Sequence, residues 1–196
     1  MPTKPYVACL LATLFLLLLP SIESSASELQ KPLEAEIESL RNDLAKLAEN
    51  GAYIVIDTVH NRLQIRQGNS IVREAICATG SGKILLGPKR KAWQFGTPKG
   101  IRLIERKVTD PIWAKPEWAF VETGLEVPVL PWAFNRLDLT TLGKYAIKLG
   151  DGYEIHGTLY PRLLGRHITH GCIRLDDEDL AFAYKYATVG NRVYIY

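Results

Sequence analysis

Short runs of β-branched and alternating residues, which begin at Ala52, constrain the fold of this chain most strongly. Tyr53–Asp57 is an almost continuous apolar run, and Arg62–Arg66 alternates strictly between polar and apolar residues. Residues 67–70 then offer a tight Gly-Asn turn, so the sequence predicts a β-hairpin at this point. Further strands are expected at residues 71–78, 100–108, 145–149, 153–156 and 192–196.

These runs predict a mainly β domain, an antiparallel sandwich or barrel-like fold with one or two short helices, over residues 52–196. No strand–helix–strand alternation is visible, so parallel strands are not expected. One helix is expected at residues 180–186, because the acidic run Asp176–Asp179 suits a helix N-terminus.

Two segments interrupt the predicted strands. Residues 80–100 are rich in Gly, Lys and Pro, whereas residues 109–139 carry three tryptophans and several prolines. A long segment of the second kind either covers a binding site as a lid or carries tryptophans that fill the core. The sequence leaves both interpretations open.

The N-terminal residues have the pattern of an export signal. Lys4 precedes an apolar run at residues 6–19, and Ser24-Ser25-Ala26 offers small residues for cleavage, so residues 1–26 are predicted to be a signal peptide. The protein is then expected in the periplasm or cell wall, with membrane contact only through an uncleaved signal. Residues 27–51 are predicted to form an amphipathic helix or spacer, since apolar residues recur at helical spacing.

Charge and cysteine content narrow the possible partners. A net charge of +3 with interspersed signs does not indicate nucleic acid, and nothing in the sequence determines the oligomeric state. Cys77 and Cys172 would ordinarily suggest one disulfide in an exported protein. We expect both to be free, with Cys77 an inert buried thiol, because a bond would consume Cys172.

Cys172 stands in a cluster with three of the four histidines of the chain, His156, His167 and His170. The cluster fits a thiol nucleophile with an imidazole base, a zinc site made of these four side chains, or a structural cluster. We favour the first, because the spacing matches no common zinc pattern. Backbone N–H groups of Gly171 and Cys172 would then face an oxyanion. Such a pair predicts that Cys172 is alkylated well below the ordinary cysteine pKa of about 8.5.

Two motifs, Ile155-His156-Gly157-Thr158 and Thr169-His170-Gly171-Cys172-Ile173-Arg174-Leu175, resemble the signature of the L,D-transpeptidase catalytic domain family. Residues 78–80, 96–101 and 191–196 also resemble elements of that family, so the resemblance spans roughly residues 52–196.

The resemblance implies a cysteine acyltransferase that acts on peptidoglycan stem peptides, with no metal and no organic cofactor. It implies that Cys172 is the nucleophile and His156 its base, oriented by the carbonyl of Gly157. His170 and Gly171 would shape the oxyanion site, Arg174 would help position the turn or bind a substrate carboxylate, and Thr169 would bind substrate. It gives no role to His167. Arg174 has a structural alternative, an ion pair with the acidic run that follows it.

Three functions remain open from the sequence. A transpeptidase would join two stem peptides or attach an envelope protein as acyl acceptor. A carboxypeptidase or hydrolase would use water at the same site. A wall-binding module without turnover is the third alternative, and the intact Cys172 with both flanking histidines argues against it.

Overall fold

The structure is a computed structural model, and it describes residues 31–39 and 51–196. The predicted signal peptide and most of the predicted spacer lie outside the described residues. Residues 31–39 are helical with exposed side chains, and they belong to a unit separate from residues 48–196. Within these ranges, no helix has the length and apolar character needed to cross a membrane.

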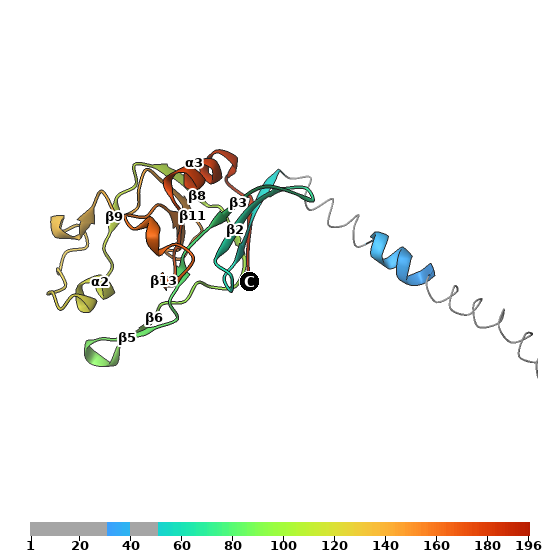
Figure 1. The fold of residues 1–196 in the computed structure, drawn as a ribbon. Helices are drawn as coiled ribbons and strands as arrows, with labels where there is room; N and C mark the ends of the chain where they lie inside the picture. Colours follow the sequence, from blue (N-terminus) through green and yellow to red (C-terminus); the bar gives the residue numbers. More distant parts are fainter. Residues whose placement is uncertain (1–30, 40–50) are drawn as a thin grey trace, which may run out of the picture. The chain divides into compact units, whose positions relative to one another are not determined.

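A five-stranded sheet forms one side of the β domain (Figure 1). Its order is β3 (Ser70–Ile76), β2 (Arg62–Gln67), β1 (Ala52–Asp57), β15 (Arg192–Ile195) and β7 (Gly100–Leu103). The predicted hairpin is confirmed, since β2 and β3 pair antiparallel around the turn at residues 67–70. Alternation along β1 and β2 buries one side of each strand, at Ile54, Ile56, Leu63 and Ile65.

A four-stranded sheet carries the two histidine-containing motifs. Its order is β14 (Ile173–Arg174), β12 (Glu154–His156), β11 (Tyr145–Lys148) and β8 (Arg106–Thr109). One face of this sheet joins a common core with side chains of the first sheet and of helix α3 (Asp177–Tyr186). The acidic helix start is confirmed, because Asp176 caps α3 by accepting a hydrogen bond from the Asp179 N–H.

The prediction of a mainly β domain with one or two short helices is confirmed, but its strand pairs are not all antiparallel. Strands β1 and β15, β12 and β14, and β13 (His167–Thr169) and β4 (Thr79–Gly80) pair in parallel. The domain is therefore mixed, and its sheets stay open without closing a barrel. These pairs join segments that are distant in sequence or linked by long connections, which local patterning does not reveal.

The single strand predicted at residues 100–108 is in fact two strands in different sheets, β7 and β8. Buried Ile104 still forms backbone hydrogen bonds with Gly190 and Asn191, which directly precede β15 of the first sheet. The next N–H, that of Glu105, donates to the Lys148 carbonyl in the second sheet. The chain changes sheet at this corner.

The two segments predicted to be irregular contain short elements. Residues 80–100 hold the hairpin of β5 (Ile84–Leu86) and β6 (Ala92–Gln94), joined across the 3-10 turn η1 (Pro88–Arg90). Residues 110–139, here called the lid segment, hold β9 (Trp113–Ala114), α2 (Glu117–Glu122), η2 (Phe134–Arg136) and β10 (Leu137–Asp138). Both project on the same side of the domain in Figure 1. A last 3-10 turn, η3 (Pro161–Leu163), precedes β13.

Candidate active site

Sheet register brings the nucleophile and base candidates to one face. Ile155 pairs with Ile173, and both are fully buried in the core. His156 pairs with Arg174, so these two side chains occupy the opposite face. Extending the register back by one residue sets Cys172 beside Glu154, again on the face of His156.

The turn before Cys172 is held by two threonine hydroxyls. Thr169 Oγ1 donates to the Cys172 carbonyl at 2.6 Å and accepts from the Gly171 N–H at 3.1 Å. Thr97 Oγ1 donates to the Gly171 carbonyl at 2.9 Å and accepts from the Gly80 N–H at 2.8 Å. Thr97 therefore joins the site as a residue that positions the turn, a role that sequence reasoning did not assign.

Two predicted roles in this turn are not supported by these contacts. Thr169 is 1% exposed and its hydroxyl is used inside the turn, so it shapes the turn and does not face a substrate. The Gly171 N–H already donates to Thr169, which leaves the Cys172 N–H as the oxyanion donor of the predicted pair. Gly171 itself is required, because its φ is 126° and an added Cβ would lie 2.7 Å from the ring of Tyr153.

The thiol of Cys172 is not activated in this structure. Its Sγ donates to the Gly152 carbonyl at 3.7 Å. Burial first, and next the nearby charge of Glu154, raise the pKa of Cys172 to about 11, although Arg174 and Lys148 act in the opposite direction. A raised thiol pKa opposes the prediction that Cys172 is alkylated well below pH 8.5, and the alkylation rate as a function of pH is the test of that prediction.

His156 is a neutral base. Burial lowers the pKa of its imidazole to about 3, and the positive charge of Arg174 acts in the same direction, while the Gly157 backbone opposes both. In the described part of the chain, Nδ1 of His156 has no partner with hydrogen-bond geometry. The Gly157 backbone still acts on the ring as an acceptor, since it raises the pKa of His156, so the expected orienting contact is present with a geometry looser than that of a hydrogen bond. Gly157 also packs closely against Gly143, because a Cβ added to Gly157 would lie 3.1 Å from the Gly143 Cα.

A charged pair that the sequence did not single out lies beside the thiol. Lys148 and Glu154 face each other across β11 and β12 and form an ion pair, with Glu154 only 5% exposed. Strand alternation sets Glu154 on the face of His156, and this periodicity is the signal that could have identified it.

His170 contacts the lid segment. Its ring stacks on Trp118 with 4.1 Å between centroids and meets the edge of Phe95 at 4.5 Å. Its Nε2 lies 2.8 Å from a carboxylate oxygen of Glu122 in α2. Helix α2 is tied to the neighbouring hairpin by the ion pair between Lys91 and Glu117.

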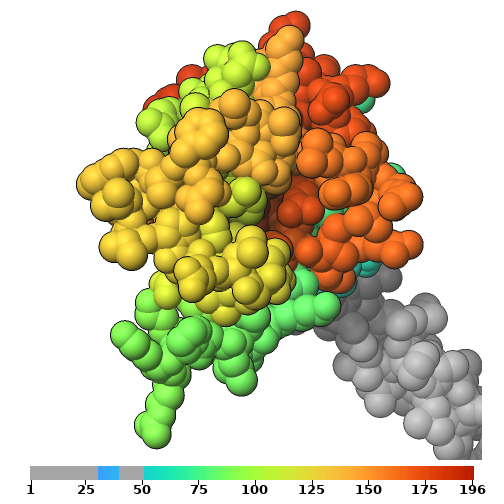
Figure 2. Space-filling view, turned by 90° about the vertical axis from the view of Figure 1, so that its left-hand side faces the viewer, coloured from blue at the N-terminus to red at the C-terminus, as the bar shows by residue number. Residues whose placement is uncertain are grey.

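These contacts favour the lid interpretation of the tryptophans. Trp118 covers His170, whereas Trp132 is 73% exposed, so the alternative in which the tryptophans fill the core is wrong for that residue. In Figure 2 a recess lies between the yellow lid segment and the orange residues near 160. The lid segment thus forms one wall of the site.

Arg174 is a cation without an acidic partner among the described residues. Burial lowers its pKa, and no ion pair joins it to the acidic run that follows. Asp176 caps α3, and Glu178 and Asp179 bind Arg73 instead. The structural ion-pair alternative for Arg174 is therefore wrong.

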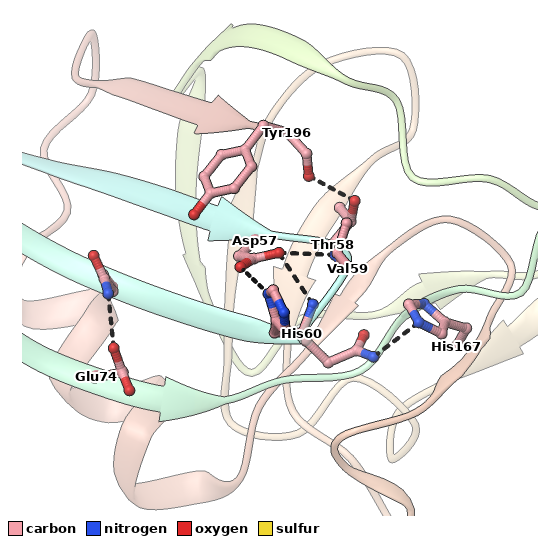
Figure 3. Close-up of polar contacts among 9 residues, drawn as sticks. Asp57, Thr58, Val59, His60, Glu74, His167 and Tyr196 are labelled. Atoms are coloured by element: carbon pink, nitrogen blue, oxygen red, sulfur yellow. Dashed lines mark hydrogen bonds and ion pairs between the residues drawn. The ribbon is translucent and has the colours of Figure 1, made fainter.

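The remaining histidines and Cys77 lie outside this site. His167 contacts Asn61 at 3.2 Å and Thr79 at 3.1 Å, and His60 pairs with Asp57 at 2.6 Å. Figure 3 shows His60 in the turn between β1 and β2, and His167 facing that turn from β13. The candidate zinc ligands are not gathered: among the described residues, no three His, Cys, Asp or Glu side chains are arranged to hold a metal ion. Cys77 and Cys172 are both free thiols, and burial raises the pKa of Cys77 to about 12.

The sequence of this chain is similar to a known protein family and to several of its members. Residues 51–195 match the family model described as the L,D-transpeptidase catalytic domain, YkuD. The chain is 33% identical over 100 residues to the probable L,D-transpeptidase ErfK/SrfK of Salmonella typhimurium, covering 50% of this chain and 32% of that protein. It is 33% identical over 90 residues to the probable L,D-transpeptidase YbiS of Escherichia coli, covering 46% of this chain and 29% of that protein. The matched region is thus about a third of those relatives.

Solved structures share the fold at low sequence identity. An L,D-transpeptidase from Xylanimonas cellulosilytica aligns with a TM-score of 0.54 at 18% identity, covering 74% of this chain and 60% of that one. The catalytic domain of the E. faecium L,D-transpeptidase aligns with a TM-score of 0.52 at 15% identity, covering 74% of this chain and 96% of that domain.

Proposed function

This chain belongs to the L,D-transpeptidase catalytic domain family, and on that premise we propose that it is a cysteine-dependent peptidoglycan L,D-transpeptidase. The observation that best supports the proposal is that a free thiol, a neutral buried imidazole and an unpaired guanidinium share one sheet face, at Cys172, His156 and Arg174. The acyl donor would be a stem peptide, and the acceptor an amine of a second stem or of an envelope protein.

Acylation begins with movement of the thiol. In the resting protein the Cys172 Sγ donates to the Gly152 carbonyl. Arg174 is the residue paired with His156, so Cys172 is offset from His156 by two residues, or roughly 7 Å measured along the strand direction. Rotation of the side chain brings the sulfur towards the imidazole. Because the pKa of Cys172 is raised and that of His156 is lowered, proton transfer before attack is unfavourable. Transfer is therefore coupled to attack, or follows a change in the site on substrate binding.

The thiol attacks the carbonyl carbon of the third stem residue as His156 takes the proton, and a carbon–sulfur bond forms. The Cys172 N–H and the guanidinium of Arg174 stabilise the oxyanion. When the carbon–nitrogen bond breaks, the imidazolium gives its proton to the leaving amine of the terminal D-amino acid. A thioester on Cys172 remains.

The acceptor amine then attacks the thioester and gives a proton to His156. The new amide forms, the carbon–sulfur bond breaks, and the thiolate recovers the proton from the imidazolium. Water in place of the amine would give the carboxypeptidase or hydrolase product from the same intermediate. No step requires a metal or an organic cofactor. We further propose that residues 1–26 direct export to the periplasm or cell wall, that residues 27–51 are a spacer and that residues 52–196 are the catalytic domain.

Mass spectrometry of the purified protein with a tetrapeptide stem tests this proposal. We expect an acyl adduct on Cys172, a released D-amino acid and, with an amine acceptor, a crosslinked dimer. Cys172→Ala should abolish all three products, and Cys77→Ala serves as the matched thiol control. Dimer formation by the Cys172→Ala protein would overturn the mechanism, and hydrolysed tripeptide alone would favour the water-dependent activity.

A further inference from the structure

The imidazole of His167, to which the proposed reaction gives no role, connects β13 to two buried polar side chains. Its Nδ1 lies 3.1 Å from the Thr79 hydroxyl in β4, and its Nε2 lies 3.2 Å from the amide nitrogen of Asn61 in the β1–β2 turn (Figure 3). The Thr79 hydroxyl also donates to the side-chain oxygen of Asn61 at 2.6 Å. Asn61 and Thr79 are 2% and 1% exposed, so these polar groups depend on one another for hydrogen bonds. We call these three side chains the clasp.

The donors and acceptors of the clasp fit only a neutral imidazole. The Asn61 amide nitrogen also donates to the Gly165 carbonyl at 3.3 Å, which fixes the nitrogen and oxygen ends of that amide. Because this nitrogen is only a donor, Nε2 of His167 must accept and carries no proton. The single hydroxyl proton of Thr79 is given to Asn61, so the hydroxyl accepts from Nδ1–H of His167. The ring is thus held as the neutral Nδ1–H tautomer.

A second proton on the ring would break this arrangement. An added Nε2–H would face the Asn61 NH₂ group, which leaves two donors with no acceptor between them. Thr79 and Asn61 would keep the bond between themselves, and the imidazolium, which stands at an exposed position, would turn towards water. The clasp therefore holds β13 only while His167 is neutral.

The elements around the ring offer an imidazolium no ion pair. Asp57 is bound to His60 at 2.6 Å, and among the described residues no carboxylate lies within ion-pair distance of His167. Arg62 at the start of β2 and Arg166 just before β13 add positive charge. Strand β4 and the rest of β13 carry no titratable side chain. Nothing around the ring thus compensates for the bond that protonation breaks.

The clasp fastens the two strands that support the nucleophile turn. His167 pairs with Thr79, and Thr169 pairs with Gly80, where β13 and β4 run side by side. The Thr169 hydroxyl holds the carbonyl of Cys172. The Gly80 N–H donates to the threonine hydroxyl that holds the preceding carbonyl of the turn. A change in the position of β13 is therefore passed to the residue that carries the sulfur.

We propose that His167 is a positioning residue for the nucleophile turn: its neutral ring fixes β13, and through it Cys172, and a proton on the ring releases the turn. The positioning is complete at about pH 8 and is lost towards about pH 5, because imidazoles take up a proton within that interval. The inference rests on the proposed function, since it concerns the cysteine that is acylated there.

Proton–nitrogen NMR spectra of the histidine rings, recorded on the full chain, test the protonation state. At about pH 8 we expect His167 to show a protonated Nδ1 and an unprotonated Nε2, with its signals assigned as those absent from the His167→Ala protein. An Nε2–H tautomer, or an imidazolium at that pH, would overturn the inference.

The single-turnover rate of acyl-adduct formation on Cys172, followed by mass spectrometry, tests the positioning. At about pH 8 the wild-type protein should react at least about threefold faster than His167→Ala, as for the loss of one or two neutral hydrogen bonds. The ratio of the two rates should fall to about one at about pH 5, and it cancels the effects of groups that titrate in both proteins. An equal ratio at both pH values would refute the positioning role.

Two variants in the β1–β2 turn sharpen this test. His60→Ala is the matched control, because its side chain is 73% exposed and binds Asp57, and its rate should equal the wild-type rate at both pH values. Asn61→Asp should keep the rate at about pH 5, because a carboxylate oxygen accepts from Nε2–H of the imidazolium, and Asp tolerates the φ of 54° at this position. A loss in acid as large in Asn61→Asp as in wild type would contradict the inference.

The backbone amide NMR signal of Cys172 separates this inference from the proposed function, because it needs no substrate. The signal should move between about pH 8 and about pH 5 by more in wild type than in His167→Ala. Such a difference without any acylation would leave the positioning inference standing and remove the proposed mechanism. Acylation by the wild-type protein with equal movement of the signal in both proteins would remove the inference alone.

Discussion

The buried carboxylate of Glu154 should control the reactivity of the Cys172 thiol, and Glu154→Gln tests that coupling. The two residues lie on adjacent strands, roughly 5 Å apart. A unit charge at that distance contributes about 3 kcal/mol at an effective dielectric constant of about 20, or about two pKa units. Because Cys172 is partly exposed, water screens part of this effect. The expected fall in the thiol pKa is therefore about one to two units.

The assay is the rate of Cys172 alkylation by iodoacetamide as a function of pH, in a Cys77→Ala background. The wild-type midpoint should lie near pH 11, because the pKa of Cys172 is raised to about 11, and Glu154→Gln should move the midpoint down. Glu178→Gln is the matched control, since its side chain is 83% exposed on α3, on the core side of the sheet.

Lys148 is left without its partner in the Glu154→Gln protein, but its side chain is 27% exposed and can reach water, so the domain should still fold. Circular dichroism checks that point. An unchanged midpoint in the folded variant would refute the electrostatic coupling. A wild-type midpoint below pH 8.5 would refute the argument from burial.

Three further perturbations probe the base, the turn and the lid. The buried imidazole of His156 has a pKa of about 3 in the folded protein, against 6.5 when unfolded. Its contribution to the free energy of unfolding is therefore fully present above pH 6.5 and is lost as the pH drops towards 3. Urea unfolding should show a loss of about 2 kcal/mol between pH 8 and pH 5, because the free energy of unfolding falls by about 1.36 kcal/mol per pH unit once the pH is below the unfolded pKa of 6.5; equal slopes in wild type and His156→Asn would contradict the burial argument. Gly171→Ala should abolish acylation and destabilise the domain by about 1 to 3 kcal/mol, because a Cβ would lie 2.7 Å from Tyr153 at a φ of 126°; full activity would show that the turn tolerates a side chain. Trp118→Ala should shift the NMR signals of the His170 ring, whereas Trp132→Ala, at a position 73% exposed, should not, and identical spectra in both variants would contradict the stacking.

Local patterns predicted much of the framework. The alternation in β2 with its Gly-Asn turn predicted the first hairpin, and the acidic residues after Asp176 predicted the start of α3. These features depend on strand period, turn geometry and helix capping, which act among residues a few positions apart. The strand predicted at residues 153–156 is confirmed as β12, whereas β14, which follows Cys172, was not predicted.

Other parts of the site could not be predicted in this way. Helix α2 is a single short element in a proline-containing segment, and Trp118 is held in place by contact with His170 and Phe95. The split of residues 100–108 between two sheets follows from the hydrogen bonds of Ile104 and Glu105 with distant residues. No pattern in the neighbouring sequence distinguishes these outcomes.

The sequence by itself determined which residues could act as nucleophile and base, and it placed His156 at the end of a strand and Cys172 after a tight glycine turn. Only the tertiary structure decided their protonation. Burial and the charge of Glu154 raise the pKa of Cys172, and burial with the charges of Arg174 and Lys148 lowers the pKa of His156, which opposes the activated pair expected from the motif. The physical reason is that a pKa depends on the loss of water around a group and on charges brought from neighbouring strands, and both arise only when distant segments pack together.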